Sequence, residues 1–236
     1  MGRLVLVHGS VTNGPMTWSA QRALATRWEL VVLNRPGFPP GPPVDHSDFE
    51  EDADWVAGRL EPADHLVGHS YGGVIALLAA VRGPTLRSLT VVEPPAFGIA
   101  RGHGAVEEFV RSSTLHWLRA GELEPEEFMR GFLPLVGSAY APPSPLPPEL
   151  EQGARTLMVE RPPWEAEIPL AELRETPFPK LVVTGAHHDG FDAVARVLEY
   201  ELDAERAVCP GAGHAVQAAP GFNDRLADFL ERAERG

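Results

Sequence analysis

The sequence contains a single cysteine, Cys209, among its 236 residues. One thiol can form no internal disulfide and supplies no cluster of thiolate ligands for a metal. The consecutive His187, His188 and Asp189 could suggest a metal site, but consecutive side chains rarely point to one centre, and no H-x-x-x-H pattern accompanies them. We therefore expect neither a metal nor any other cofactor.

Positive charge is also scarce, because 20 Lys and Arg stand against 33 Asp and Glu, for a formal net charge of -13 at pH 7. A surface of this sign repels nucleic-acid phosphates and anionic membrane headgroups. We therefore expect no nucleic-acid partner and no binding to membrane surfaces.

Long apolar runs are missing as well. No run approaches the roughly 20 residues that a membrane-spanning helix needs. The first residues, "RLVLVHGS", begin a strand-like pattern without the basic and apolar regions of a signal peptide. The location expected from these features is the cytoplasm.

What the sequence does contain is an alternation of short apolar runs with amphipathic stretches, which is typical of strands joined by crossover helices. The apolar runs predict strands at residues 3–8, 29–34, 64–69, 86–93, 180–185 and 205–210. The other stretches predict helices at residues 18–27, 47–60, 71–81, 191–202 and 223–232. Ser47 is the expected N-cap of the second helix, with Glu50 completing a capping box. The predicted fold is α/β, with a mostly parallel six-stranded sheet and helices on both faces.

The alternation stops in the middle of the chain. Helical periodicity at residues 105–120 and 125–135 is followed there by the proline-rich "APPSPLPPE". So long an excursion within a compact domain is usually functional. We therefore predict an α/β core of residues 1–95 and 179–236, and a helical cap of residues 96–178 inserted after the strand that ends at Glu93.

The pentapeptide Gly68-His69-Ser70-Tyr71-Gly72 matches G-x-S-x-G between a predicted strand and a predicted helix. In that context the serine occupies a strained turn, which exposes its hydroxyl above the carboxyl edge of the sheet, beside a helix N-terminus. The pentapeptide alone fits a simple glycine-containing turn equally well. Ser70 is therefore a candidate nucleophile, and its companions decide between the two interpretations.

A catalytic serine requires a base and a carboxylate that orients the base, and candidates for both follow Ser70 in the chain. "GAGHAV" places His214 in a loop after the last predicted strand, from which an imidazole can reach over the sheet edge. Two carboxylates satisfy the order: Asp189, just beyond one strand, and Glu93, at the end of the strand after the Ser70 helix. We prefer Asp189 and keep Glu93 as the alternative, whereas Asp192 falls in the next helix.

Backbone N–H groups and apolar side chains complete the candidate site. "HGSVTNG", after the first predicted strand, can offer an N–H from Ser10 or Val11, which joins that of Tyr71 to bind an oxyanion. Apolar residues recur in the inserted segment, at Phe109 and Trp117 among others, and imply a small substrate with an apolar acyl or ring group.

These motifs resemble the α/β-hydrolase superfamily, in particular its small, capped members that are esterase-like or haloperoxidase-like. The stretches "VLVHGS", "LNRPGF", "HLVGHSYGGVIAL", "LVVTG" and "PGAGHAV" occur in the family's order and span nearly the whole chain. The resemblance implies that Ser70 is the nucleophile, His214 the base and Asp189 the acid, with Ser10 and Tyr71 as oxyanion donors. It also implies that the inserted segment shapes the acyl pocket.

The sequence departs from the family pattern in three ways. The first two of the usual eight strands are missing, Asn34 stands where an Asp is common, and His188 occupies the usual position of the acid, one residue before Asp189. The expected activity is hydrolysis of a carboxylic ester or thioester through an acyl-enzyme. The alternatives are a cofactor-free perhydrolase, C–C hydrolase or lyase on the same fold, and a non-catalytic ligand-binding protein.

Overall fold

The computed structural model describes residues 1–235, which contain one sheet of six parallel strands. The strands are β1 (Arg3–Val7), β2 (Glu29–Leu33), β3 (His65–His69), β4 (Ser88–Val92), β5 (Lys180–Thr184) and β6 (Glu205–Val208). Their spatial order is β2-β1-β3-β4-β5-β6, so that the order reverses between β1 and β3. Each strand lies within a run predicted from the sequence, and the expected α/β fold is confirmed.

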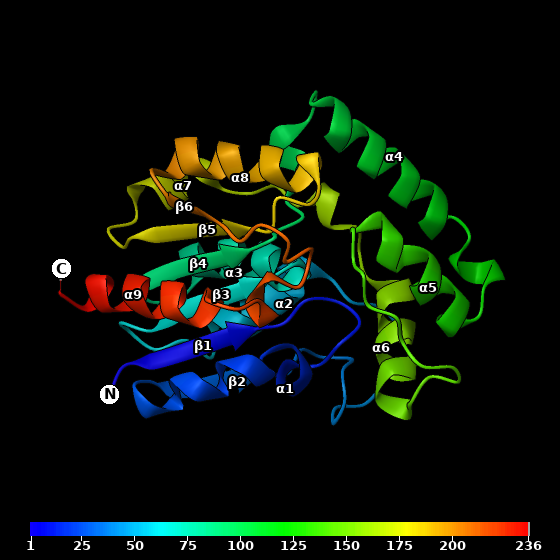
Figure 1. Cartoon of the computed structure of the whole chain (residues 1–236), viewed down its shortest axis with the longest axis horizontal. Coiled ribbons are helices and arrows are strands. Elements are labelled where there is room, and N and C mark those ends of the chain that lie inside the picture. Colours follow the sequence, from blue (N-terminus) through cyan, green and yellow to red (C-terminus); the bar gives the residue numbers. More distant parts are fainter. Residues whose placement is uncertain (236) are drawn as a thin grey trace.

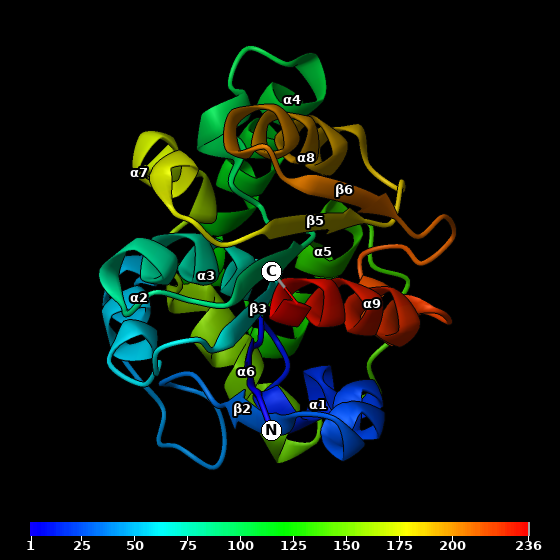
Figure 2. The ribbon, with the colours of Figure 1, turned by 90° about the vertical axis from the view of Figure 1, so that its left-hand side faces the viewer.

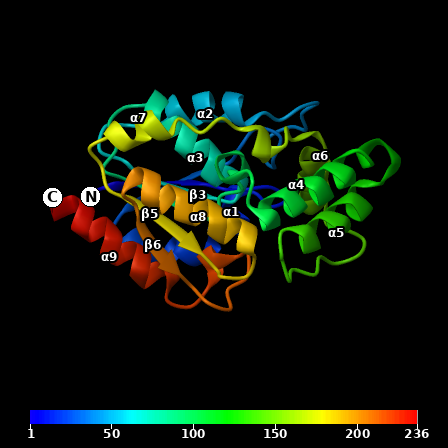
Figure 3. The same ribbon diagram turned by 90° about the horizontal axis from the view of Figure 1, so that it is seen from above.

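Helices cover both faces of the sheet (Figure 1). The helices α2 (Phe49–Ala57), α3 (Tyr71–Arg82), α7 (Leu170–Glu175) and α8 (Asp189–Leu202) pack on one face. The 3₁₀ helix η1 (Ser19–Thr26) and α9 (Phe222–Arg235) pack on the other. Figure 2 shows α2, α3 and α7 to the left of the sheet and α9 to its right, and Figure 3 shows the same division from above. Because both faces are covered, the central strands are apolar on both sides.

Residues 97–165, which are most of the segment between β4 and β5, lie beyond the carboxyl ends of the strands (Figure 1), whereas α7, at the end of this segment, packs on the sheet face. Residues 97–165 form η2 (Phe97–Ala100), α4 (Gly104–Trp117), η3 (Ala120–Glu122), α5 (Pro125–Leu135), α6 (Pro148–Val159) and η4 (Pro163–Glu165). Helices α4, α5 and α6 therefore stand over the sheet edge at which functional loops of parallel sheets gather. The role of this segment as a cap stays a prediction.

The predicted start of α2 is wrong by one residue. Asp48, not Ser47, is the N-cap, and its carboxylate accepts a hydrogen bond from the Glu50 N–H at 2.7 Å. The backbone of Ser47 instead pairs with the chain at the end of α6. Its N–H donates to the Val159 carbonyl, and its carbonyl accepts from the Arg161 N–H. A pairing between such distant segments leaves no local signal in the sequence.

Two other helical segments differ from expectation. The helix predicted at residues 18–27 is the 3₁₀ helix η1, preceded by the short α1 (Gly14–Thr17). Helix α6 was not predicted, because it begins inside the proline-rich stretch, with Pro148 at its first position. Proline is favourable there, since the N–H that it lacks has no partner within the helix. Among the described helices, none is long and apolar enough to cross a membrane.

Candidate active site

Ser70 occupies the turn between β3 and α3 in a strained backbone conformation, with φ of 52° and ψ of -126°. Two glycines make this turn possible. A Cβ atom on Gly68 would lie 2.2 Å from the carbonyl oxygen of Gly72, and one on Gly72 would lie 2.4 Å from that of His8. Because no side chain fits at either position, the G-x-S-x-G pattern has a steric cause here.

The imidazole of His214 lies beside the Ser70 hydroxyl, with 2.9 Å between His214 Nε2 and Ser70 Oγ. His214 lies in the loop between β6 and η5 (Val216–Ala218) and is only 8% exposed. Burial, with the nearby imidazoles of His187 and His188, lowers the pKa of His214 to about 3. The ring is therefore neutral at neutral pH, and its Nε2 can accept the Ser70 proton.

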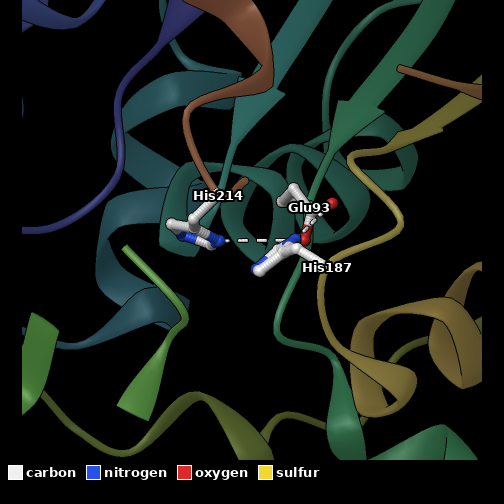
Figure 4. Close-up of side chains that lie close together, drawn as sticks. All are labelled: Glu93, His187 and His214. Atoms are coloured by element: carbon white, nitrogen blue, oxygen red, sulfur yellow. Dashed lines mark ion pairs between the residues drawn. The ribbon is translucent and has the colours of Figure 1, made fainter. Parts of the chain in front are cut away.

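A buried carboxylate faces the other nitrogen of that imidazole. Glu93 directly follows β4 and is 0% exposed, and its Oε2 lies 3.7 Å from His214 Nδ1 (Figure 4). Neither of these two atoms has a hydrogen-bond partner among residues 1–235, whereas Glu93 Oε1 accepts from the Gly185 N–H. Two unpartnered polar atoms that face each other in a protein interior need only a small approach to form a hydrogen bond. Glu93 is thus placed to orient His214.

The carboxylate preferred from the sequence lies elsewhere. Asp189 is the first residue of α8 and is exposed, and no ion pair or hydrogen bond joins it to His214 within the described chain. Helix α8 begins two residues earlier than predicted, because the His188 side chain caps it by accepting from Gly190 N–H at 3.0 Å. Asp192, in the same helix, accepts a hydrogen bond from Thr184 Oγ1 at 2.9 Å.

The residues predicted to bind an oxyanion border Ser70. Ser10 and Tyr71 line one cavity together with Ser70, and Val11 lines a second cavity. Tyr71 is the first residue of α3, so its N–H has no acceptor within the helix. The loop of Val11, whose φ is 73°, packs tightly on α6: a Cβ on Gly153 would lie 1.9 Å from the Val11 carbonyl oxygen.

Two cavities border Ser70. The first is small, and its walls are mainly apolar. They include Phe109, Trp117, Phe132, Val136, Leu157 and Trp164. The second is larger and is also bordered by His214 and Tyr140. A substrate can therefore place one part on each side of the serine.

A buried cluster of charges beside the first cavity was missed by the sequence analysis. Arg35 Nε lies 2.8 Å from Asp52 Oδ2, and Arg35 Nη1 lies 2.9 Å from Glu160 Oε1. Glu160, which borders the cavity, accepts a hydrogen bond from the Ser10 hydroxyl. The Arg35 guanidinium also lies over the ring of Tyr71. The cluster connects the loop of Ser10 to the end of α6. Of its charged residues, only Arg35 lies in a stretch quoted for the family resemblance, "LNRPGF".

Replacing Arg35 with Met is expected to lower the free energy of unfolding by about 3–5 kcal/mol, since Asp52 and Glu160 then lose their buried counter-charge. Urea denaturation measures the change. The matched control is Arg82→Met, which breaks partly exposed ion pairs with Glu50 and Asp54 and should cost under about 1 kcal/mol. Equal losses in the two variants would contradict the expectation.

Comparisons with known proteins point to one family. A family model described as "Alpha/beta hydrolase family" matches residues 4–228. A pimeloyl-[acyl-carrier protein] methyl ester esterase of Aliivibrio fischeri is 27% identical over 141 residues, which are 58% of this chain and 54% of that protein. An esterase of the same name from Aeromonas hydrophila is 36% identical over 98 residues, 40% of this chain and 39% of that protein. The chain thus spans about half, or less, of the length of these relatives.

A solved structure agrees with the fold. The structure of MenH from S. aureus covers 99% of this chain and 94% of its own, with a TM-score of 0.76 and 17% sequence identity. At that identity, the likeness concerns the fold alone.

Proposed function

Because the chain belongs to the α/β-hydrolase family, we propose that it is a serine hydrolase that cleaves carboxylic ester or thioester bonds of small apolar substrates. The observation that carries this proposal is the 2.9 Å distance between the Ser70 hydroxyl and a neutral, buried His214 imidazole. The names of the matched relatives support ester cleavage over the lyase and perhydrolase alternatives. A cytoplasmic location stays a prediction from composition.

The proposed reaction has two halves. Ser70 Oγ attacks the substrate carbonyl as His214 Nε2 takes its proton, and the N–H groups of Tyr71 and of Ser10 or Val11 bind the oxyanion. His214 then protonates the leaving alcohol or thiol, which leaves Ser70 acylated. In the second half, His214 takes a proton from water, the resulting hydroxide attacks the acyl group, and Ser70 regains its proton as the acid leaves. Glu93 stabilises the imidazolium in both halves.

We further propose that residues 96–178 form a cap that encloses the acyl group. All six apolar walls named for the first cavity belong to this segment: Phe109, Trp117, Phe132, Val136, Leu157 and Trp164. This cavity is the smaller of the two that border Ser70, which suits a short acyl chain.

The size of this cavity predicts a preference for short acyl chains. We expect kcat/KM for p-nitrophenyl butyrate to exceed that for p-nitrophenyl dodecanoate by at least about tenfold. Replacing Trp164 with Ala enlarges the cavity and should reduce this ratio, mainly by improving the longer ester. Equal ratios in the wild type and the variant would place the acyl group elsewhere.

Covalent labelling tests the proposed function directly. A fluorophosphonate probe should modify one residue, and mass spectrometry of the digested protein should locate the label on Ser70. A label on another residue would refute the assignment. Tight binding of an ester without any acyl-enzyme burst would favour a non-catalytic ligand-binding protein. Turnover of peroxide or cyanohydrin substrates above that of esters would favour the perhydrolase or lyase.

The rate of ester hydrolysis should depend on the charge of Glu93. Burial raises the pKa of this carboxyl to about 7, against the opposing effect of the Gly185 N–H. Below that pH Glu93 is neutral and cannot stabilise the imidazolium, so kcat/KM is expected to rise with pH and to level off about one pH unit above 7. A pH–rate profile measures this, with Glu93→Gln as the control that should lose the transition. A wild-type profile that is flat through pH 7 would contradict it.

A further inference from the structure

Three buried polar atoms beside the Ser70 site face one another without a hydrogen-bond partner among residues 1–235. They are Glu93 Oε2, His187 Nδ1 and His214 Nδ1, and their side chains converge from three directions (Figure 4). Each imidazole Nδ1 lies 3.7 Å from an oxygen of the Glu93 carboxylate. Ligand atoms of the three residues all lie within 4.8 Å of one another. Buried polar atoms are rarely left unpaired, and one ion at this point could contact all three residues.

The contacts of His187 show what kind of partner is needed. His187 Nε2 donates to the Val136 carbonyl at 3.0 Å, which in the neutral ring leaves the lone pair on Nδ1. The ring is held in this orientation by Gly137, on which a Cβ atom would lie 2.4 Å from the imidazole. His187 Nδ1 therefore faces Glu93 Oε1, which already accepts from the Gly185 N–H, while Glu93 Oε2 faces His214. A cation held between the carboxylate and the two imidazoles would be a partner for all three unpartnered atoms.

We propose that Glu93, His187 and His214 form a site for a divalent transition-metal ion such as Zn²⁺, and that its binding switches off the hydrolase. Two imidazoles and one carboxylate form a common ligand set for Zn²⁺, with water as a fourth ligand. Tetrahedral Zn²⁺ holds its ligand atoms about 3.3 Å apart, so modest side-chain movements close the site around the ion. The ligands follow β4, β5 and β6, three neighbouring strands of the sheet.

Binding of the ion reverses the role of His214. The metal takes the lone pair of Nδ1, so the single proton of the neutral ring must reside on Nε2. The Nε2–H then points at the Ser70 hydroxyl and can no longer accept its proton. The Glu93 carboxylate is engaged at the same time. This inhibition rests on the proposed function, whereas the binding of the ion does not.

Two neighbouring histidines allow a matched test of the site. Protein treated with EDTA is titrated with Co²⁺, whose visible spectrum reports coordination, and with Zn²⁺ by calorimetry. Hydrolysis of p-nitrophenyl butyrate is followed with and without Zn²⁺. The variants are His187→Asn, which removes a ligand, and His188→Asn. The latter keeps a side chain that caps α8, because Asn is a good N-cap residue.

The wild type and His188→Asn are expected to bind one ion and to lose at least about tenfold in activity at saturating Zn²⁺, reversibly with EDTA. His187→Asn should bind the ion at least about tenfold more weakly, and its activity, relative to its own value without metal, should resist the same Zn²⁺ concentration. Equal affinity in His187→Asn and the wild type, or no binding to the wild type, overturns the proposal. If no variant hydrolyses esters, the proposed function fails. Even in that case, a Co²⁺ spectrum that is lost in His187→Asn but kept in the wild type and in His188→Asn supports the metal site.

Discussion

Replacing Glu93 with Gln is expected to lower kcat for ester hydrolysis by about 10³–10⁴-fold, with little change in KM. Glu93 Oε2 is the unpartnered carboxylate oxygen opposite His214 Nδ1, at 3.7 Å. A Gln side chain has the same shape but no negative charge, and its amide can favour the wrong tautomer of the ring. Steady-state kinetics with p-nitrophenyl butyrate measure the loss.

Asp189→Asn is the matched control for this prediction. Asp189 lies exposed at the start of α8, so its variant should hydrolyse the ester within about twofold of the wild type. Thermal unfolding of both variants distinguishes a lost charge from a lost fold, since Glu93→Gln removes no volume. A large loss in Asp189→Asn together with normal activity in Glu93→Gln would restore the acid first preferred from the sequence.

Replacing Ser70 with Ala is expected to lower kcat by at least about 10⁴-fold and to abolish labelling by a fluorophosphonate. The proposed reaction passes through an ester of Ser70 itself, which alanine cannot form. The variant keeps the cavity and the oxyanion donors, so it should still bind substrate with a similar affinity. Steady-state hydrolysis of p-nitrophenyl butyrate measures the loss of kcat, and gel electrophoresis of the labelled protein measures the loss of labelling.

Ser10→Ala provides a control in the same cavity. The Ser10 hydroxyl donates to Glu160, but its expected catalytic contribution is through the backbone N–H, which the substitution retains. We therefore expect a loss of less than about tenfold in kcat. Labelling that survives in Ser70→Ala, or that disappears in Ser10→Ala, would assign the nucleophile differently.

Backbone strain supports the same location for the site. Val11, Ser70, Glu93 and Ala186 all have positive φ angles, between 50° and 73°. All four lie in the turns that directly follow strands or precede helices at the carboxyl edge of the sheet. Non-glycine residues in this region cost conformational energy, and such strain tends to occur where a side chain or N–H must be aimed at a ligand. The two other such residues, Ala63 and Asp203, lie before strands β3 and β6.

The local pattern of the sequence was sufficient to predict the strands, the turn that contains Ser70 and the loop that contains His214. Most of this depends on residues that are close in the chain: Gly68 leaves room for the Gly72 carbonyl within the strained turn, and short apolar runs between glycines and prolines form the strands. Local sterics and periodicity act over a few residues, so they can be read without a structure. The same holds for the overall α/β fold, which follows from the alternation of elements.

The tertiary structure alone decided which carboxylate faces His214 and which side chains surround it. Because β4 lies between β3 and β5, Glu93 at the end of β4 lies beside the imidazole of His214. His188 is the N-cap of α8, so that the helix begins at Asp189 and leaves this carboxylate at the surface. The pairing of Arg35 with Glu160 likewise joins segments far apart in the chain. Such contacts depend on strand order and on helix starts. Residues that meet in this way share no spacing in the sequence, and only the folded sheet brings them together.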